Sequence, residues 1–230
     1  MVDKPRRKKQ GSHGRAYLTL GIVLVLVVAG VSYAYVAGLG PFNKQATSTS
    51  TNMTSATATT PSLLYARINT SLGSFEIELF NSLTPKTVAN FVNLVNQGFY
   101  NNLVWHRIQP GFVIQTGDPT TRFGGGNRST WGESSSGVYV PFEYVSSLHN
   151  DEYYLGMAST GPKVGGSSQF YINLANNSAS LDEKYAVFGK VISGYNVVQA
   201  LGSVPVEQVG GQDEPVTPVY VTSITMISGP

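Results

Sequence analysis

Short runs of alternating apolar and polar residues, separated by turn signals, constrain the fold of this 230-residue chain more than any other feature. The side chains of Phe75, Ile77 and Leu79 alternate with polar ones, as in a strand with one buried face. Residues 65–69 precede this run and Gly73 lies in the turn between them, so the domain is predicted to open with a β-hairpin. Further short strands are predicted on both sides of the Pro-Gly turn at 110–111 and over residues 154–158, 169–174, 186–192 and 219–227.

Two helical patterns accompany these strands. Thr84 supplies a predicted N-cap, Pro85 suits the first turn, and Gly98 lies where a C-terminal cap is expected. The apolar residues at helical spacing between them are Val88, Phe91, Val92 and Val95. A shorter helix is predicted over residues 197–201, and residues 116–138, rich in Gly, Ser and Thr, are predicted to form a surface loop. Many short strands, two helices and no strand–helix–strand alternation predict a mainly β fold, a closed antiparallel barrel.

The N-terminal part of the chain has a different character, because residues 16–39 form a run of 24 residues without a charge. A helix needs about 20 apolar residues to cross a bilayer, whereas the apolar part of a signal peptide has about 7–15. Six of the fifteen Lys and Arg residues lie in residues 1–15, and such a basic flank stays in the cytoplasm. We therefore predict a cytoplasmic tail (1–15), a single-pass, uncleaved transmembrane helix (16–39) and a domain on the extracytoplasmic side of the cell membrane. The alternative is a long signal peptide cleaved at the small residues 36–38.

Residues 40–62 are predicted to be a disordered tether, because eleven of the eighteen residues from 45 to 62 are Ser or Thr. Asn52 in this tether fits the N-glycosylation pattern. The folded domain is predicted over residues 63–230, where Lys and Arg are scattered, so nucleic acid is not an expected partner. The chain has no cysteine, which excludes thiol catalysis and Cys-based metal sites.

Residues 105–118 combine the side chains expected of a binding site. The turn at residues 110–111 joins two short strands, so side chains from both arms come close together. Arg107 offers a rigid fork of N–H donors, Phe112 offers apolar area, and Gln115 can both donate and accept a hydrogen bond. Strict alternation would put Phe112 and Gln115 on opposite faces, a division that twist or a bulge relaxes. The set suits a neutral peptide carbonyl.

The pattern Trp-His-Arg-Ile-x-Pro-Gly-Phe-x-x-Gln-x-Gly-Asp over residues 105–118 resembles the signature of the cyclophilin-type peptidyl-prolyl cis-trans isomerases. Gly-Met-Ala-Ser-x-Gly-Pro over residues 156–162 and Ser-Ser-Gln-Phe-Tyr-Ile over residues 167–172 resemble the second block of that family. Ala-Val-Phe-Gly-Lys-Val over residues 186–191 resembles the third. The three blocks stand in the expected order, and the resemblance extends from about residue 64 to the C-terminus.

This resemblance implies a closed, eight-stranded antiparallel barrel capped by two helices, and the activity of a prolyl isomerase. Rotation about an X-Pro bond is slow because the C–N bond is partly double, which gives peptide bonds a barrier of about 18–20 kcal/mol. A donor aimed at the prolyl nitrogen weakens that resonance, so neither a cofactor nor a metal is expected. The expected partners are proline-containing polypeptide substrates.

The resemblance also implies roles for individual residues. Arg107 would be the donor, Phe112 the floor of a proline pocket, and Gln115 would steady Arg107 or bind the substrate backbone. These three are the predicted catalytic residues. The predicted substrate-binding residues are Val113, Ala158, Ser159, Gln169, Tyr171, Leu181 and Tyr185. Tyr171 stands where the family has Phe, and Tyr185 where it usually has His.

The same residues have other interpretations, which the sequence leaves open. Large apolar residues such as Phe112, Val113 and Leu181 are more often buried for stability than for binding. A lone arginine such as Arg107 more often forms a surface ion pair. His106 is interpreted as structural, since no second ligand at metal spacing is near it. A Ser-His-Asp hydrolase built on it lacks a Gly-x-Ser-x-Gly elbow.

Taken together, the sequence predicts a membrane-anchored, monomeric cyclophilin-type isomerase that assists the folding of exported proteins. The rival prediction is a cyclophilin-like module that holds proline-containing segments of a partner without turnover. The presence of Arg107, Phe112 and Gln115 together favours the enzyme.

Overall fold

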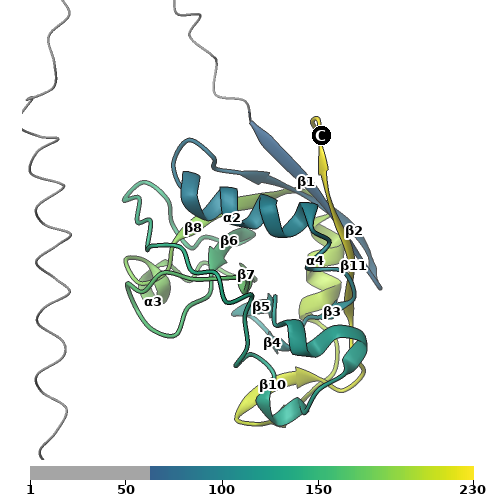
Figure 1. Cartoon of the computed structure of the whole chain (residues 1–230). Helices are drawn as coiled ribbons and strands as arrows, with labels where there is room; N and C mark the ends of the chain where they lie inside the picture. The colour runs from purple at the N-terminus through teal and green to yellow at the C-terminus, as the bar shows by residue number, and fades with distance from the viewer. Residues whose placement is uncertain (1–62) are drawn as a thin grey trace, which may run out of the picture. The chain divides into compact units, whose positions relative to one another are not determined.

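The computed structural model describes residues 63–230, and this part of the chain is a mainly β domain (Figure 1). It contains a sheet of nine strands, a sheet of two strands and three α-helices. The strands are β1 (Leu64–Thr70), β2 (Gly73–Leu79), β3 (Leu103–Val104), β4 (Arg107–Gln109), β5 (Val113–Thr116), β6 (Tyr154–Met157), β7 (Phe170–Asn173), β8 (Val187–Ser193), β9 (Val206–Val209), β10 (Gln212–Pro215) and β11 (Tyr220–Ile227). The helices are α2 (Pro85–Asn96), α3 (Ser178–Leu181) and α4 (Tyr195–Gly202), with the 3-10 helices η1 (Pro119–Gly124) and η2 (Arg128–Thr130).

The first and last strands of the described part lie side by side. Tyr65 on β1 pairs with Ile227 on β11, so the domain begins close to where it ends (Figure 1). The predicted cytoplasmic tail (1–15), transmembrane helix (16–39) and tether (40–62) lie outside the described residues. Within residues 63–230, no helix has both the length and the apolar character that crossing a membrane requires.

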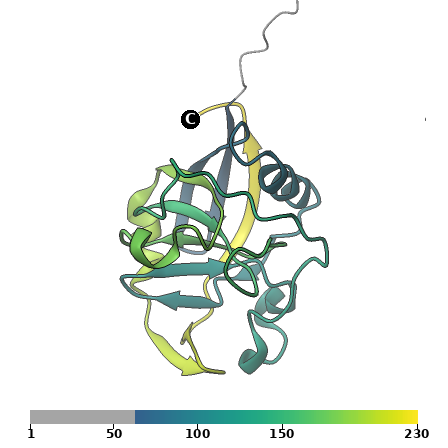
Figure 2. The ribbon, with the colours of Figure 1, turned by 90° about the vertical axis from the view of Figure 1, so that its left-hand side faces the viewer.

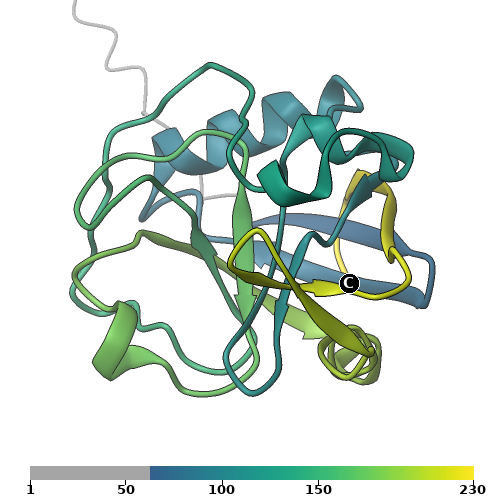
Figure 3. The same ribbon diagram turned by 90° about the horizontal axis from the view of Figure 1, so that it is seen from below.

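The nine-stranded sheet is antiparallel throughout and curls around the core, in the strand order β3-β11-β1-β2-β8-β6-β7-β5-β4 (Figure 3). The predicted β1–β2 hairpin is confirmed, with Phe75, Ile77 and Leu79 buried on one face. Ile68 on β1 is the cross-strand partner of Phe75, so both strands contribute to the same core.

The sheet does not close, so the prediction of a closed, eight-stranded barrel is wrong. The edge strands β3 and β4 share no backbone ladder in the described part of the chain, although only Trp105 and His106 separate them. Backbone groups of Val104 and Trp105, beside this gap, form hydrogen bonds with residues outside β4. The amide of Trp105 donates to the carbonyl of Val219 at 2.9 Å, and the hydroxyl of Thr116 donates to the carbonyl of Val104 at 2.9 Å. The curled sheet is therefore a half-barrel whose gap is bridged by a side chain.

Helix α2 starts at the predicted proline, but its N-terminal cap is not the predicted one. The side chain of Thr84 makes no capping hydrogen bond. The carboxylate of Glu143 instead accepts hydrogen bonds from the backbone amides of Lys86 at 3.1 Å and Thr87 at 2.7 Å. A negative group at this end of a helix satisfies free N–H donors and interacts well with the helix dipole. The cap is thus supplied by a distant loop.

The rest of α2 follows the prediction. It buries Val88, Phe91 and Val95, and Gly98 just beyond its end has the positive φ of 64° that a C-terminal glycine cap permits. Helix α4 adds three buried residues, Val197, Val198 and Leu201, to the same core. Both helices therefore pack on the curled sheet, at separate places along it (Figures 1 and 3).

Several elements were not predicted individually. Helix α3 is a single short turn, and the predicted loop over residues 116–138 contains η1 and η2. The β9–β10 hairpin turns at Gly210 and Gly211, both with positive φ, and lies at the end of the described domain opposite the C-terminus (Figure 2). Its strands carry Glu, Gln and Asp rather than alternating apolar residues, so the strand pattern does not detect them.

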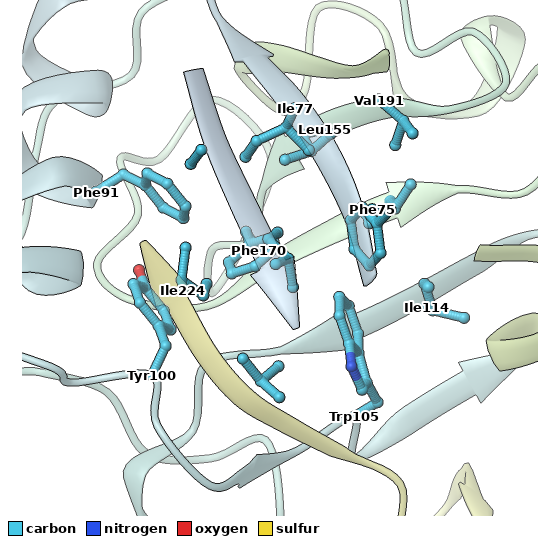
Figure 4. Packing of buried hydrophobic residues seen from close by; sticks show 14 of the residues in the cluster. Phe75, Ile77, Phe91, Tyr100, Trp105, Ile114, Leu155, Phe170, Val191 and Ile224 are labelled. Atoms are coloured by element: carbon cyan, nitrogen blue, oxygen red, sulfur yellow. The ribbon is translucent and has the colours of Figure 1, made fainter. Parts of the chain in front are cut away.

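Aromatic side chains dominate the centre of the core (Figure 4). Phe170 makes edge contacts with the rings of Phe91, Tyr100 and Trp105, with centroids 5.5 to 5.9 Å apart. All four side chains are fully buried. This packing fixes the inner face of the sheet, and the outer face of β4, β5 and β7 is left for the site described below.

The distant cap generates a stability prediction. Glu143→Ala should lower the free energy of unfolding by about 1–2 kcal/mol, because two N–H groups of α2 lose their acceptor. Urea denaturation measures the change. The control is Thr84→Val, which keeps the side-chain shape but removes the hydrogen bond that the Thr84 hydroxyl donates to the carbonyl of Phe80 at 3.3 Å. That carbonyl retains two backbone donors at 2.9 Å, so this variant should cost less. Equal losses in the two variants would show that Glu143 is not the cap.

Candidate active site

The site is built on the β4–β5 hairpin, where Arg107 and Gln115 are direct cross-strand partners. Ile108 and Ile114, the next pair, are fully buried on the other face. Gly111 makes the connecting turn possible with a φ of 72°, a conformation that favours glycine. The alternation of side chains therefore anchors one face in the core and presents Arg107 and Gln115 on the other.

Phe112 joins these two residues because it lies in the turn rather than in the strand. Strand β5 begins one residue later, so strict alternation does not apply to Phe112. Its carbonyl accepts hydrogen bonds from the amide of Leu174 and from the side chain of Asn177, both at 2.8 Å. Its ring centre lies 5.7 Å from the guanidinium carbon of Arg107, within cation–π range. The three predicted catalytic residues are thus adjacent.

Arg107 is held by amide oxygens rather than by a carboxylate. Its Nη2 donates to Gln109 Oε1 at 2.6 Å and its Nη1 donates to Gln115 Oε1 at 3.3 Å. None of the ion pairs among residues 63–230 includes it. Burial lowers the pKa of Arg107, an effect that the nearby carboxylate of Asp213 opposes, and an arginine stays cationic at neutral pH even so. The structure therefore differs from the surface ion pair that a lone arginine more often forms.

Nine of the ten predicted site residues line one cavity of about 270 Å³. They are Arg107, Phe112, Val113, Gln115, Ala158, Ser159, Tyr171, Leu181 and Tyr185. The tenth, Gln169, lines a neighbouring cavity of about 130 Å³, which shares Gln115, Ala158 and Ser159 with the first. The two cavities are therefore contiguous along one surface.

The apolar side of the larger cavity is separate from the core. Phe112, Val113 and Leu181 do not belong to the core cluster, although Val113 is only 2% exposed. The rings of Tyr171 and Tyr185 meet edge to face with centroids 6.2 Å apart. The alternative that these residues are buried in the core is therefore wrong for Phe112 and Leu181, whereas Val113 is buried and also lines the cavity. The cavity has the size and lining to take a small apolar ring.

Gln169 lines the neighbouring cavity and is also engaged in hydrogen bonds within the protein. Its Oε1 accepts a hydrogen bond from Gln115 Nε2 at 2.9 Å. Its Nε2 donates to the carbonyls of Gly132 at 2.8 Å and Ser134 at 2.7 Å. Gln169 thus supports Gln115 and holds the loop after η2, and Gln115 accepts from Arg107 with one end and donates to Gln169 with the other.

Asn150 and Gly156 also shape the cavity, through their contacts with Tyr171, and neither was predicted to do so. The hydroxyl of Tyr171 donates to Asn150 Oδ1 at 2.7 Å, and burial raises the pKa of this phenol. Gly156 is the cross-strand partner of Tyr171, and a Cβ at Gly156 would lie 2.1 Å from Tyr171 Cζ. The tyrosine in the place of the family's phenylalanine is therefore accommodated by a glycine beneath it. The Gly–Tyr pair is visible in the sequence only when the strand register is known.

His106 does not take part in a catalytic triad. It is fully buried, and neither ring nitrogen has a hydrogen-bond partner in the described part of the chain. Burial lowers its pKa to about 4, so the ring is neutral at neutral pH. Asp118 accepts instead from the backbone amides of Thr120, Gly132 and Ser134. Among residues 63–230 no three His, Asp or Glu side chains are grouped closely enough to hold a metal ion.

Comparisons with known proteins agree with this arrangement. Residues 65–226 match the family model described as cyclophilin type peptidyl-prolyl cis-trans isomerase/CLD. The chain is 43% identical over 154 residues to peptidyl-prolyl cis-trans isomerase-like 1 of Aspergillus oryzae, covering 66% of this chain and 89% of that protein. It is 39% identical over 163 residues to the human peptidyl-prolyl cis-trans isomerase-like 3, covering 71% of this chain and 96% of that protein.

Solved structures give the same result. A cyclophilin type peptidyl-prolyl cis-trans isomerase of Cryptosporidium parvum matches with a TM-score of 0.63 and 32% identity, over 73% of this chain and 99% of that one. A second structure of that protein, determined in the presence of the dipeptide Ala-Pro, matches with a TM-score of 0.61 and 31% identity, over 72% of this chain and 99% of that one. The fold and the cavity define a cyclophilin-type domain. This chain belongs to the cyclophilin-type peptidyl-prolyl cis-trans isomerase family.

The contact between Gly156 and Tyr171 can be tested by adding one methyl group. Gly156→Ala should lower the free energy of unfolding by about 1–3 kcal/mol, because the ring of Tyr171 must move out of a well-packed position. It should also weaken the binding of an Ala-Pro peptide, measured by titration calorimetry. Gly161→Ala is the control, since its Cβ would meet only Val164 at 3.9 Å. Unchanged melting and peptide binding in Gly156→Ala would contradict the assigned contact.

The ion pair beside α3 generates a pH prediction. His149 Nδ1 lies 2.7 Å from Asp182 Oδ2, and this hydrogen bond raises the pKa of His149 above its ordinary value of 6.5. A raised folded-state pKa gives stability that is fully present below about pH 6.5 and is lost as the pH rises through the folded value. The urea midpoint of the unmodified protein should therefore exceed that of His149→Gln at pH 5.5, and the difference should shrink by pH 9. A difference that grows with pH would contradict the pairing.

Proposed function

We propose that the domain catalyses cis–trans isomerisation of X-Pro bonds in polypeptides, acting as a monomer. The observation that carries this proposal is the cationic guanidinium of Arg107 beside an apolar cavity, bound only by two amide oxygens. An arginine has five N–H donors, and the two hydrogen bonds to Gln109 and Gln115 leave others free for a ligand.

The reaction needs little more than this geometry. The proline ring enters the cavity against Phe112, and the walls of Val113 and Tyr171 limit its movement. A free N–H of Arg107 donates to the prolyl nitrogen, whose lone pair becomes localised as the C–N bond twists. The interaction is stronger in the twisted state than in the planar one, so it lowers the barrier. No bond is made or broken.

Gln115 acts in this proposal by holding Arg107 rather than by binding the substrate. Its side-chain amide is engaged at both ends, by Arg107 and by Gln169. The Ala-Pro dipeptide present with the related Cryptosporidium protein supports a proline-containing ligand for this cavity.

The role of Arg107 is tested by removing it. Arg107→Ala should lower kcat/KM for a peptide with one X-Pro bond by about 10²–10³-fold, because a transition-state donor is lost. Exchange of the peptide between cis and trans, followed by NMR, gives the rate. The control is Arg67→Ala, which removes an arginine that pairs with Glu76 on β2, and its rate should be unchanged. Full activity in Arg107→Ala would exclude Arg107 as the donor.

We further propose that residues 16–39 anchor the protein in the cell membrane and that the domain faces the extracytoplasmic side, where exported polypeptides fold. The length of the uncharged run, the basic residues before it and the Ser/Thr-rich stretch after it support this placement. A domain on such a tether can reach substrates near the membrane surface without leaving it.

Controlled proteolysis tests the topology. Protease added to intact cells should cut within residues 45–62 and release an isomerase fragment, because a segment of small polar residues is a preferred site of cleavage. A cytoplasmic protein, left intact in the same sample, is the control for cell integrity. Protection of the domain until the cells are lysed would reverse the orientation. A protein found entirely in the culture medium would indicate a cleaved signal peptide instead.

A further inference from the structure

The side chain of Arg128 joins two segments that are distant in sequence, η2 and the β9–β10 hairpin. Its Nε donates to Glu214 at 2.9 Å and its Nη1 donates to Glu207 at 2.8 Å. Its Nη2 donates to the carbonyl of Pro215 at 2.9 Å. The side chain of Glu214 is fully buried, whereas that of Glu207 is 46% exposed. We call Arg128, Glu207 and Glu214 the arginine clasp.

The clasp also fixes the start of the loop that follows η2. The guanidinium carbon of Arg128 lies 5.4 Å from the ring centre of Trp131. Gln212 on β10 donates its side-chain amide to the carbonyl of Trp131 at 2.7 Å. Trp131 is the only buried residue from 125 to 136, so apolar burial gives this loop little support of its own. Polar contacts therefore hold it in place: those from β10 to Trp131, and those of Asp118 and Gln169 with Gly132 and Ser134.

A chain of hydrogen bonds continues from this loop to Arg107. The carbonyls of Gly132 and Ser134 accept from Gln169, whose Oε1 accepts from Gln115. Gln115 in turn accepts from Arg107. An amide that donates at one end and accepts at the other has one orientation that satisfies both partners. A shift of the loop would therefore rotate or release Gln169 first and Gln115 next.

We propose that Arg128 is a positioning residue for Arg107, because the arginine clasp holds the loop that orients Gln169 and Gln115. This inference rests on the proposed isomerase function, in which the guanidinium must meet the prolyl nitrogen closely. Misplacement of a reacting group by about 1 Å can cost about 100-fold in rate, even when the mutation is far from the chemistry. The β9–β10 hairpin thereby becomes part of the catalytic apparatus without touching the substrate.

The first test monitors the hydrogen-bonded side-chain amides directly by NMR, and it does not require the protein to have isomerase activity. In the full chain, Arg128→Gln should shift the side-chain amide NMR resonances of Gln115 and Gln169. The matched control is Arg67→Gln, which likewise removes an arginine–glutamate pair. In this pair Arg67 on β1 lies 2.7 Å from Glu76 on β2, and its loss should leave both resonances in place. Unshifted resonances in a folded Arg128→Gln variant would overturn the proposal, whether or not the chain is an isomerase.

The second test is a double-mutant cycle on kcat. Arg128→Gln should lower kcat by about 10-fold and change KM by less than about 2-fold, since the cavity walls are untouched. Arg128→Lys, which keeps the charge beside Glu214, should recover part of the loss. In the Arg107→Ala background, Arg128→Gln should cause no further loss, because the residue acts through Arg107. An equal loss in both backgrounds would identify Arg128 as a general structural residue and overturn the proposal.

Two other outcomes, an inactive unmodified chain and an Arg128→Gln variant that does not fold, can be told apart from a failure of the proposal. If the unmodified chain has no isomerase activity, the proposed function fails, and the NMR test alone decides whether the clasp orients the glutamines. If Arg128→Gln does not fold, Glu207→Gln takes its place, because it removes only the exposed arm of the clasp. It should shift the same two resonances and lower kcat by a smaller factor, and no change in either would overturn the proposal.

Discussion

The register of the β4–β5 hairpin is the constraint on which the site depends. It pairs Arg107 with Gln115 on one face and buries Ile108 against Ile114 on the other. A slip of one residue would turn the isoleucines toward the cavity and an arginine toward the core, so the hydrophobic core and the site enforce the same register. The turn at Gly111 then brings Phe112 beside the arginine. Fold stability and site geometry are therefore set by one short segment.

Polar contacts organise the remainder of the site. The curled sheet leaves a gap between β3 and β4, and a side-chain hydroxyl, that of Thr116, bridges it by binding a backbone carbonyl. Along the cavity, Gln115 and Gln169 link Arg107 to a loop that the β9–β10 hairpin holds through Arg128. The chemistry needs one well-oriented N–H donor and a dry pocket for a ring. A network of amides orients the guanidinium without a direct ion pair to a carboxylate, which would compete with the substrate for its donors.

The predictions that succeeded depend on local pattern or on the family resemblance. Alternation in β2 and helical spacing in α2 were sufficient for the hairpin and the helix, and the resemblance gave nine residues of one cavity. The predictions that failed depend on contacts between distant segments. Glu143 caps α2 from more than fifty residues away, and the closure of the sheet depends on where the backbone of Trp105 finds its acceptor. Arg128 looks like an ordinary loop arginine until the polar strands β9 and β10, which carry no apolar alternation, are placed beside it.

The most direct test of this account measures catalysis and contact together. Exchange NMR on a peptide with one X-Pro bond, at a small molar fraction of the unmodified protein, reports the rate of cis–trans exchange. With Arg107 as the donor, exchange is expected on the order of a second or faster, against roughly tens to hundreds of seconds for the uncatalysed bond. The protein resonances that shift are expected to be those of residues lining the Arg107 cavity. An uncatalysed rate in a sample where the peptide binds that cavity would exclude isomerase activity and identify the domain as a binding module.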